Sequence, residues 1–249
     1  MHEDGILSRG SRAPYARCVG SRLRVVVLAL SAGCVDAVGF LLLFGVFTAH
    51  LSGDTTRLAV DLGRGDLGTD ALARTAVLVV FVLGVVVGVA VVASTARRER
   101  ALLAAEIGCV VAVLVVGTIA RDDRSLRYGS GVFYVVVILA ALAMGLQSAY
   151  LRRVSGASVH TTFITGMLTA LAEDGVAYYR DRGDHDARAR ISLHGTIWLS
   201  YLAGGIVGAA LALELHLWAL TLPIVLLVFV LARADFARTP YSPPSGRAR

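Results

Sequence analysis

Long, nearly uncharged apolar stretches recur along this 249-residue chain and constrain its fold more than any other feature. Since 56% of the residues are hydrophobic and only 17% are charged, the composition argues against a soluble enzyme, a nucleic-acid-binding domain or a secreted disulfide scaffold. Each stretch approaches the roughly 20 residues that an α-helix needs to cross a hydrocarbon layer of about 30 Å. Six such spans are predicted, at residues 24–47, 75–96, 101–120, 131–151, 193–214 and 217–233.

The arginines predict how these spans are oriented. All 24 basic residues are arginines, and with both termini in the cytoplasm 18 of them fall on the inner side. Only six remain outside, in agreement with the excess of positive charge that cytoplasmic loops carry. We therefore expect a multi-pass protein of a bacterial inner membrane, in contact with the lipid bilayer. Its polar ends, residues 1–23 and 234–249, are expected to be disordered cytoplasmic segments.

The chain is also similar to itself at a shift of about 113 residues. Residues 48–56 and 161–169 share the frame Thr-x-x-x-Ser/Thr-Gly-x-x-Thr, and the dipeptide Leu-Ala follows at the same place in both. Upstream, Asp36 aligns with Ser148 if one residue is inserted in a loop, and downstream a Gly-x-x-x-Gly pair follows in each half. Shared landmarks in the same order predict an internal repeat.

We infer two membrane repeats of three spans each, residues 24–120 and 131–233. Because three is odd, the second repeat enters the membrane from the opposite side. Inverted repeats are common in secondary transporters, whose substrate sites lie near the membrane midplane where helices are broken. The expected fold is an all-α integral membrane protein with six transmembrane helices as two inverted three-span repeats, each with a polar half-helix or interfacial segment.

The two polar segments are the first candidates for a substrate or ion site. In a helix, the hydroxyl residues of each segment fall on one face. The segments are too polar to face lipid, so they are either re-entrant half-helices lining a cavity or amphipathic helices at the interface. Both readings stay open. The candidates are Thr48, Ser52, Gly53 and Thr56 in the first segment, and Thr161, Thr162, Thr165, Gly166 and Thr169 in the second.

Asp36 is the most informative single residue, because it lies inside an otherwise apolar span. An ionised carboxylate there costs at least about 2.5 kcal/mol and generally faces a cavity, an ion or a partner. Coupling to a proton or cation and a structural hydrogen bond are equally compatible with it. Gln147 and Ser148 add uncharged polar groups, which complete a site or tie two helices together. His50 and Asp54, four residues apart, have the spacing of a proton relay or of a solvated helix face.

Other signals are weaker. The pairs Gly84/Gly88 and Gly204/Gly208 fit close helix packing, within one protomer or between the protomers of a homo-oligomer. The sequence carries no zinc-binding, nucleophile-elbow or phosphate-loop motif, so no cofactor, no metal site and no enzymatic activity are expected.

Two motifs resemble those of the YoaK family of bacterial six-span inner-membrane proteins, a family catalogued as a domain of unknown function. The first runs from Ala32-Gly33-x-x-Asp36-Ala37 to Thr48-x-x-x-Ser52-Gly53-Asp54, and the second from Gly145-x-Gln147-Ser148-Ala149 to Thr161-Thr162-x-x-Thr165-Gly166. The family usually has Asn at position 54 and at position 148, so the chain departs from the family pattern at Asp54 and Ser148. The resemblance implies six spans and brings no established substrate.

Two functions from different classes follow. The first is a transporter-like permease for a small solute or ion, with a site formed by Asp36, the two hydroxyl segments and Gln147. The alternative is a non-transporting membrane scaffold or regulatory protein that associates through its Gly-x-x-x-Gly pairs. An intramembrane enzyme is disfavoured because no pairing of nucleophile and base is visible.

Overall fold

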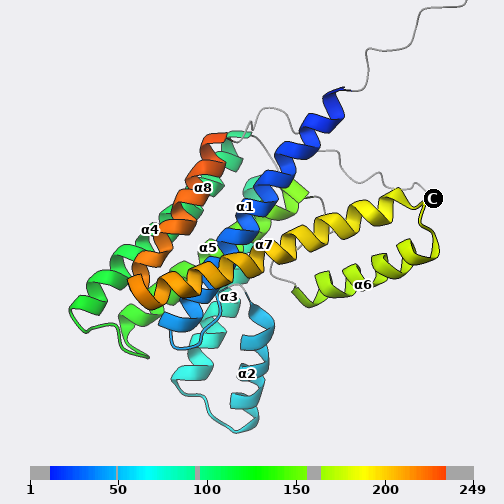
Figure 1. Ribbon diagram of the computed structural model, residues 1–249. Helices are drawn as coiled ribbons and strands as arrows, with labels where there is room; N and C mark the ends of the chain where they lie inside the picture. The colour runs from blue at the N-terminus through cyan, green and yellow to red at the C-terminus, as the bar shows by residue number, and fades with distance from the viewer. Residues whose placement is uncertain (1–11, 49, 93–95, 156–163, 234–249) are drawn as a thin grey trace, which may run out of the picture.

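The computed structural model describes residues 12–48, 50–92, 96–155 and 164–233, and every element found in them is helical. Figure 1 shows the helices coloured along the chain. The elements are α1 (Arg12–Leu42), α2 (Leu51–Gly63), α3 (Thr69–Val92), α4 (Ala96–Asp122), α5 (Gly131–Ser155), α6 (Ile164–Arg180), α7 (His185–Leu215), the short 3-10 helix η1 (His216–Leu220) and α8 (Thr221–Arg233).

Five stretches of the described residues are long and apolar enough to cross a membrane. Four of them match predicted spans with shifted ends. The fifth holds the last two predicted spans in one stretch, so six separate spans are not resolved by length and composition alone. The stretches are Arg22–Leu42, Thr69–Val91, Arg98–Asp122, Gly131–Leu151 and Asp186–Arg233.

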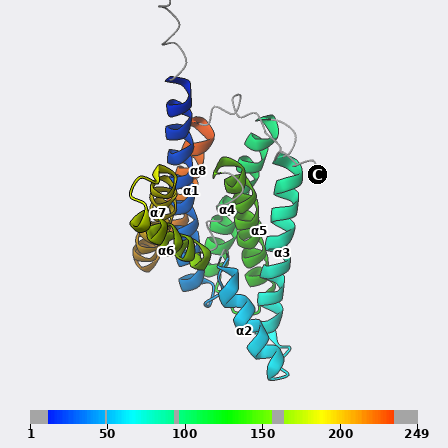
Figure 2. The same cartoon turned by 90° about the vertical axis from the view of Figure 1, so that its right-hand side faces the viewer.

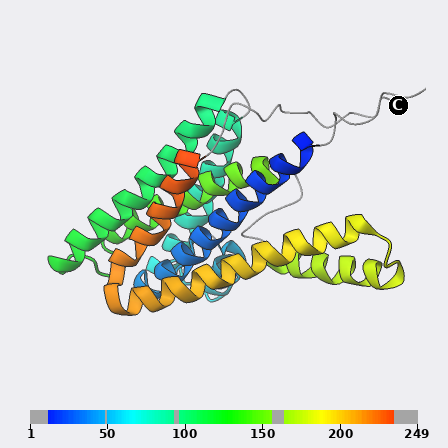
Figure 3. The same ribbon diagram turned by 45° about the horizontal axis from the view of Figure 1, so that its top comes forward.

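The fifth stretch is broken near its middle. Its 48 residues would measure about 72 Å as a single helix, more than twice the hydrocarbon thickness. α7 ends at Leu215, and His216 has a φ of 55°, a left-handed conformation that an α-helix cannot continue through. After this turn α8 lies beside α4, as Figure 3 shows in orange and green. α8 itself has 13 residues, about 20 Å.

The first span also ends earlier than predicted. α1 stops at Leu42, and not at residue 47, because the chain reverses at Phe44 (φ 58°) and Gly45 (φ 76°). At its other end α1 already begins at Arg12, so residues 12–23 continue the helix where a disordered leader was expected. Pro14 is tolerated there because the first helical turn needs no N–H donor from it. Residues 1–11 and 234–249 lie outside the described residues.

The helices pack in a defined set of pairs. α1 makes its largest contact with α7, and α3 makes its largest contact with α5. α5 also packs on α4, and α1 on α8. The two shorter helices lie against the second long helix of their own half: α2 on α3, and α6 on α7. Figures 1 and 2 show α2 and α6 projecting from the body formed by the other helices, each beside the N-terminal part of the long helix that it contacts.

Glycines allow the backbones of α1 and α7 to touch. A Cβ placed on Gly204 of α7 would collide with the carbonyl oxygen of Leu30 in α1. From the other side, a Cβ on Gly33 of α1 would collide with the carbonyl oxygen of Tyr201 in α7. Such close approach of two backbones is the role that small residues have in membrane helix pairs.

The α3–α5 pair is built in the same way. A Cβ on Gly84 of α3 would lie 2.9 Å from the carbonyl oxygen of Leu142 in α5, too close for a real side chain. A Cβ on Gly145 of α5 would meet the carbonyl oxygen of Phe81 in α3. Each crossing therefore has one glycine from each helix facing the backbone of the other.

Large apolar side chains cover the outside of the long helices. On α3, valine and leucine side chains at seven positions are about half exposed, and α7 exposes further leucine and isoleucine side chains. An apolar exterior of this extent is not compatible with water and fits contact with lipid. The exposed residues of α3 are Leu72, Val79, Val82, Leu83, Val86, Val87 and Val89.

Candidate functional site

A buried carboxyl group lies where α1, α7 and the turn after α1 meet. The Asp36 side chain is 4% exposed. Its Oδ1 accepts hydrogen bonds from the backbone N–H and the hydroxyl of Thr48, both at 3.1 Å. Its Oδ2 accepts a hydrogen bond of 2.6 Å from the hydroxyl of Tyr201. The early end of α1 makes this possible, because the reversal at Phe44 and Gly45 brings Thr48 back toward the helix.

This arrangement joins the two halves of the chain at one side chain. Asp36 and Thr48 come from the first half, whereas Tyr201 comes from α7 in the second half and is held there by the close approach of α7 to Gly33. Hydrogen-bond donors around both oxygens stabilise a buried carboxylate and also suit a carboxyl group that gives up and takes back a proton.

Asp54 is a second buried carboxyl group, in the first turn of α2. Its side chain is fully buried, and neither of its oxygens has a hydrogen-bond partner within the described chain. Burial raises the pKa of Asp54 to about 6, although the charges of Arg74 and Arg57 lower it, and Asp36 is near enough to contribute. Asp54 therefore changes its charge close to physiological pH.

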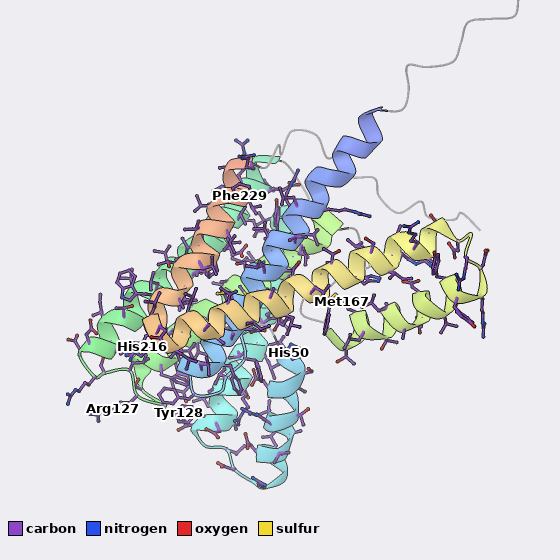
Figure 4. The ribbon with its side chains drawn as sticks, viewed as in Figure 1. His50, Arg127, Tyr128, Met167, His216 and Phe229 are labelled. Atoms are coloured by element: carbon purple, nitrogen blue, oxygen red, sulfur yellow. The ribbon has the colours of Figure 1, made fainter. Side chains whose placement is uncertain are left out.

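A chain of aromatic rings leads from Tyr201, which binds Asp36, to the start of α2. The ring of His50 lies 5.8 Å from that of Phe47 and 6.4 Å from that of Tyr201. Phe47 also stacks on Phe40, with ring centroids 4.8 Å apart. Figure 4 shows His50 at the start of α2, close to α7. His50 thus belongs to the Asp36 group, although the pairing with Asp54 suggested by its spacing is not seen as a hydrogen bond.

A small pocket opens beside Thr48. Apolar side chains of α1, α4, α5 and η1 form most of its wall, so that both halves of the chain contribute to it. Its polar element is the Thr48 side chain, which also binds Asp36. Lining residues include Val35, Val38, Val113, Ala140 and Leu217.

Gln147 is buried in α5 and ties that helix to α1. Its Nε2 donates a hydrogen bond of 2.7 Å to the carbonyl oxygen of Leu28, and its Oε1 has no hydrogen-bond partner among the described residues. The buried hydroxyl of Ser31 is likewise unpaired within those residues. Ser148, the next residue of α5, is partly buried. Gln147 therefore forms a hydrogen bond with the backbone of α1. Among the described residues it forms none with Asp36.

The first hydroxyl segment does not form the continuous helical face that its spacing predicted. Thr48 precedes α2 and points to Asp36, whereas Ser52 and Thr56 are exposed, with the Thr56 hydroxyl bonded to the Ser52 carbonyl at 3.0 Å. The physical reason is that the chain is still in a turn at Thr48, so the helical register begins only at Leu51. Gly53 packs against the Phe47 ring.

The second segment is described from residue 164 onward. Thr161 and Thr162 lie outside the described residues. Thr165 and Thr169 are exposed on α6, where the Thr169 hydroxyl donates to the Thr165 carbonyl, and Gly166 is half-buried. Within the described chain, this segment contributes nothing to the group around Asp36.

Each short helix is fastened to its neighbour by charged side chains. On the first, which we name the α2 clasp, Arg74 of α3 pairs with Asp61 of α2 and, at 3.5 Å, with Asp70. On the second, the α6 clasp, Asp174 of α6 accepts a hydrogen bond of 2.7 Å from Arg190 of α7. The same Asp174 lies 3.7 Å from His194.

The glycine pairs lie inside the protomer. Gly84 and Gly88 of α3 face α5, where a Cβ on Gly88 would lie 2.5 Å from that of Ala149. Gly204 and Gly208 of α7 face α1 in the same way. All four are therefore covered by helices of the same chain, and none is free to form a contact between copies.

The importance of Tyr201 and Glu106 was missed from the sequence. The sequence does contain a sign of Tyr201: it aligns with Phe81 in the repeat and differs from it by a hydroxyl group. Glu106 lies near the start of the predicted span 101–120, a position at which solvation is expected, yet its side chain is fully buried in α4. For metals, no group of three or more candidate ligands occurs within the part of the chain that the structure describes.

The apolar exterior, the long helices and the buried polar site define the class of protein: a polytopic helical membrane protein. Residues 25–233 match the profile of the family described as "Protein of unknown function (DUF1275)", and the chain belongs to this family. It is similar to the UPF0700 transmembrane protein YoaK of Bacillus subtilis (strain 168), with 25% identity over 210 residues, 84% of this chain and 91% of the relative. The family inferred from the two motifs is confirmed. No solved structure matches the chain.

Proposed function

We propose that this membrane protein is a transporter-like permease for a small solute or ion, built from two inverted repeats of three spans each. One observation carries the proposal. The carboxyl group of Asp36 is buried in the membrane region at the crossing of the two halves, and its hydrogen-bond partners come from both of them. An intramembrane carboxyl group between two movable halves is the usual position of a substrate or coupling-ion site.

The pairing of helices supports the repeat. If α1 to α4 correspond to α5 to α8, the α1–α7 contact corresponds to the α5–α3 contact, and the α1–α8 contact to α5–α4. The glycines follow the same rule. A shift of 112 residues relates Gly33 to Gly145, and a shift of 120 relates Gly84 to Gly204. Related glycines meet related carbonyl groups at both crossings.

The clasps support the same correspondence. Asp61 is related to Asp174, and Arg74 to His194, so that each half fastens its short helix by an acidic residue on that helix and a basic residue on the next. With the second repeat inverted, the two clasps fall on opposite sides of the membrane. We infer that the α2 clasp and the α6 clasp hold the two ends of the permeation route.

The chemistry of the two halves differs at the site. The residue related to Asp36 is Ser148, and the residue related to Tyr201 is Phe81, so the second half has neither the carboxyl group nor the hydroxyl group that binds it. The proposed permease therefore has a single charged site. The pocket beside Thr48, with apolar walls from both halves, has a volume of about 10 Å³, room for about one water molecule, which supports an ion or a very small solute.

In this proposal, transport follows from making and breaking the bonds across Asp36. The hydrogen bond from Tyr201 holds α7 against α1, and the bonds from Thr48 hold the turn that leads into α2. A cation or proton that takes the place of these donors on the carboxyl group would release both. The loosened α7 and α2 would then expose the site toward one side and, after release, toward the other.

The test is a thermal-unfolding screen of the purified protein in detergent against ions and metabolites. A ligand that binds only the native state stabilises it by RT ln(1 + [L]/Kd), about 2.7 kcal/mol at a hundredfold excess over Kd. We expect a ligand that raises the midpoint of the wild type and leaves Asp36→Asn unchanged. Tyr179→Phe, at an exposed tyrosine, is the control variant. A ligand with equal effects on wild type and Asp36→Asn would contradict a site at Asp36.

A further inference from the structure

A third buried carboxyl group lies apart from the Asp36 site. Glu106 is in α4, inside the apolar stretch Arg98–Asp122, and its side chain is fully buried. Neither of its carboxyl oxygens has a hydrogen-bond partner among the described residues. A polar group in this state is rare in native proteins and calls for a functional explanation.

The surroundings of Glu106 include other buried polar groups. Tyr150 of α5 is fully buried, and the guanidinium group of Arg24 in α1 is close to its hydroxyl. On α4, the charges of Glu99 and Glu106 also act on the Tyr150 side chain. Glu99 is itself 3% exposed. Buried and partly buried ionisable side chains of α1, α4 and α5 are therefore coupled by their charges in this part of the protein.

Few other ionisable groups face this cluster. On α4, Cys109 lies one turn beyond Glu106 and is influenced by its charge. α8 has no titratable side chain between residues 221 and 232. α3 has titratable groups only in its first two turns, and in η1 the single such group is His216, which lines a pocket with Arg121 at the far end of α4.

The protonation state of Glu106 follows from these surroundings. An ionised carboxylate without a hydrogen-bond donor is very unfavourable in a medium of low dielectric constant. The carboxyl group takes up a proton instead. Asp36 differs, because Thr48 and Tyr201 donate hydrogen bonds to it.

Glu106 and Asp36 also lie at different depths. Glu106 comes eight residues after Arg98, about 12 Å along α4, whereas Asp36 comes fourteen residues after Arg22, about 21 Å along α1. Because α1 and α4 run in the same direction through the body (Figure 1), Glu106 is nearer the end that carries these arginines.

We propose that Glu106 is a proton-binding site, occupied in the state described here and emptied when α4 and α5 move apart. On such a movement the carboxyl group turns toward the buried Tyr150 side chain of α5, on which its charge acts. The proton is then the coupling ion of the permease. This last step rests on the proposed function, whereas proton binding at Glu106 does not.

The test is labelling of the full-length protein, in its native membrane, with dicyclohexylcarbodiimide. This apolar reagent reacts with protonated carboxyl groups in apolar surroundings. Cleavage after Arg100 and Arg121 releases a peptide in which Glu106 is the single acidic residue, so its labelling can be read by mass spectrometry. We expect labelling at pH ~6, where a solvated glutamate is ionised, and at least about tenfold less labelling at the alkaline end of the pH range that the membrane withstands, because burial favours the protonated carboxyl group until the pH is well above its ordinary pKa.

Two matched variants complete the design. Glu106→Gln keeps the shape of the side chain and should lose the label entirely. Glu214→Gln, at an exposed glutamate of α7, should leave labelling of the 101–121 peptide unchanged. Absence of labelling in the wild type at the lower pH would overturn the proposal, and so would equal labelling at both, since a permanently neutral acid exchanges no proton.

Sodium provides a further distinction. Protection of Glu106 by sodium ions at constant pH would assign the site to a metal cation and overturn the proton assignment. The two proposals of this section and the previous one can fail separately. If Glu106 is labelled as expected while no ligand depends on Asp36, the permease site is refuted and the proton site stands. If instead a ligand depends on Asp36 while Glu106 is not labelled, the permease site stands and the proton site at Glu106 is refuted.

Discussion

At the scale of single residues, the protein depends on a few polar groups held in an apolar interior. Asp36 is stable there because Thr48 and Tyr201 donate hydrogen bonds to it. Asp54, by contrast, is buried with no donor among the described residues. Hydrogen bonds therefore hold the Asp36 carboxyl group in the fold, whereas the Asp54 carboxyl group changes its charge with pH.

We expect Tyr201→Phe to destabilise the protein. The change leaves one oxygen of Asp36 buried without its donor, which costs about 1–3 kcal/mol. The measurement is the thermal midpoint of the purified protein in detergent. Tyr179→Phe, whose side chain is 78% exposed, should have no effect. An equal midpoint for Tyr201→Phe and the wild type would mean that the Asp36–Tyr201 bond contributes nothing to stability.

We expect Asp54→Asn to stabilise the protein at neutral pH and to have little effect in acid. The pKa of Asp54 is raised from 3.8 to about 6 in the folded state, so the folded state binds the proton more tightly than the unfolded state. Wild-type stability therefore falls as the pH rises from about 4 through 6, by up to about 3 kcal/mol at about 1.4 kcal/mol per pKa unit. The variant lacks this loss.

The measurement for Asp54 is the difference in thermal midpoint between the variant and the wild type over this pH range. The difference should be near zero at the acid end and positive at pH ~7.5. Asp123→Asn, at an exposed carboxyl group, is the control, with a difference that does not change with pH. A pH-independent difference for Asp54→Asn would show that its carboxyl group is not titrating in the folded protein.

At the scale of elements, the contacts of glycine decide which helices can cross. Gly204 of α7 touches the backbone of Leu30, and Gly84 of α3 touches that of Leu142. Backbone cannot move aside as a flexible side chain can, so these helices must separate if a Cβ is added.

We expect Gly204→Ala to weaken folding and Gly108→Ala to be neutral or favourable. A Cβ on Gly204 has no room beside Leu30, whereas Gly108 in α4 has nothing within 4 Å of its Cβ position. In an open helix position, alanine is about 0.5–1 kcal/mol more favourable than glycine. The measurement is the yield of monodisperse protein in detergent and its thermal midpoint. Similar behaviour of the two variants would contradict the close α1–α7 crossing.

At the scale of the whole molecule, the proposed inverted repeat predicts on which side of the membrane each connection between helices lies. The α2–α3 connection and the α4–α5 connection should lie outside the cell, and the α6–α7 connection inside. Residues 66, 123 and 182 sample these connections, and all three are exposed.

We expect a membrane-impermeant maleimide to label Asp66→Cys and Asp123→Cys in intact cells, and Arg182→Cys only after the cells are made permeable. The protein for this measurement lacks its native cysteines at 18, 34 and 109. The reason is that each three-span repeat reverses the side on which the next begins. Labelling of all three positions from the same side would refute the inverted arrangement.

The sequence by itself determined the apolar spans, the family and the importance of Asp36. Spans are readable because lipid demands about 20 apolar residues in a row, whatever packs around them. A lone carboxyl group in such a run is conspicuous for the same reason. The pattern also paired Phe81 with Tyr201, although it gave no sign that the Tyr201 hydroxyl binds Asp36.

Only the tertiary structure decided which polar groups meet. The turn at Phe44 and Gly45 separates Thr48 from the helical face of Ser52 and Thr56, and helical spacing cannot anticipate a left-handed residue that ends α1 early. Glu106 is buried because α4 packs against α5 and α8, and α8 is distant from α4 in the sequence. Hydrogen bonds and burial depend on such long-range contacts. Spacing along the sequence therefore predicts candidate residues, and the packing of the helices determines which of them meet.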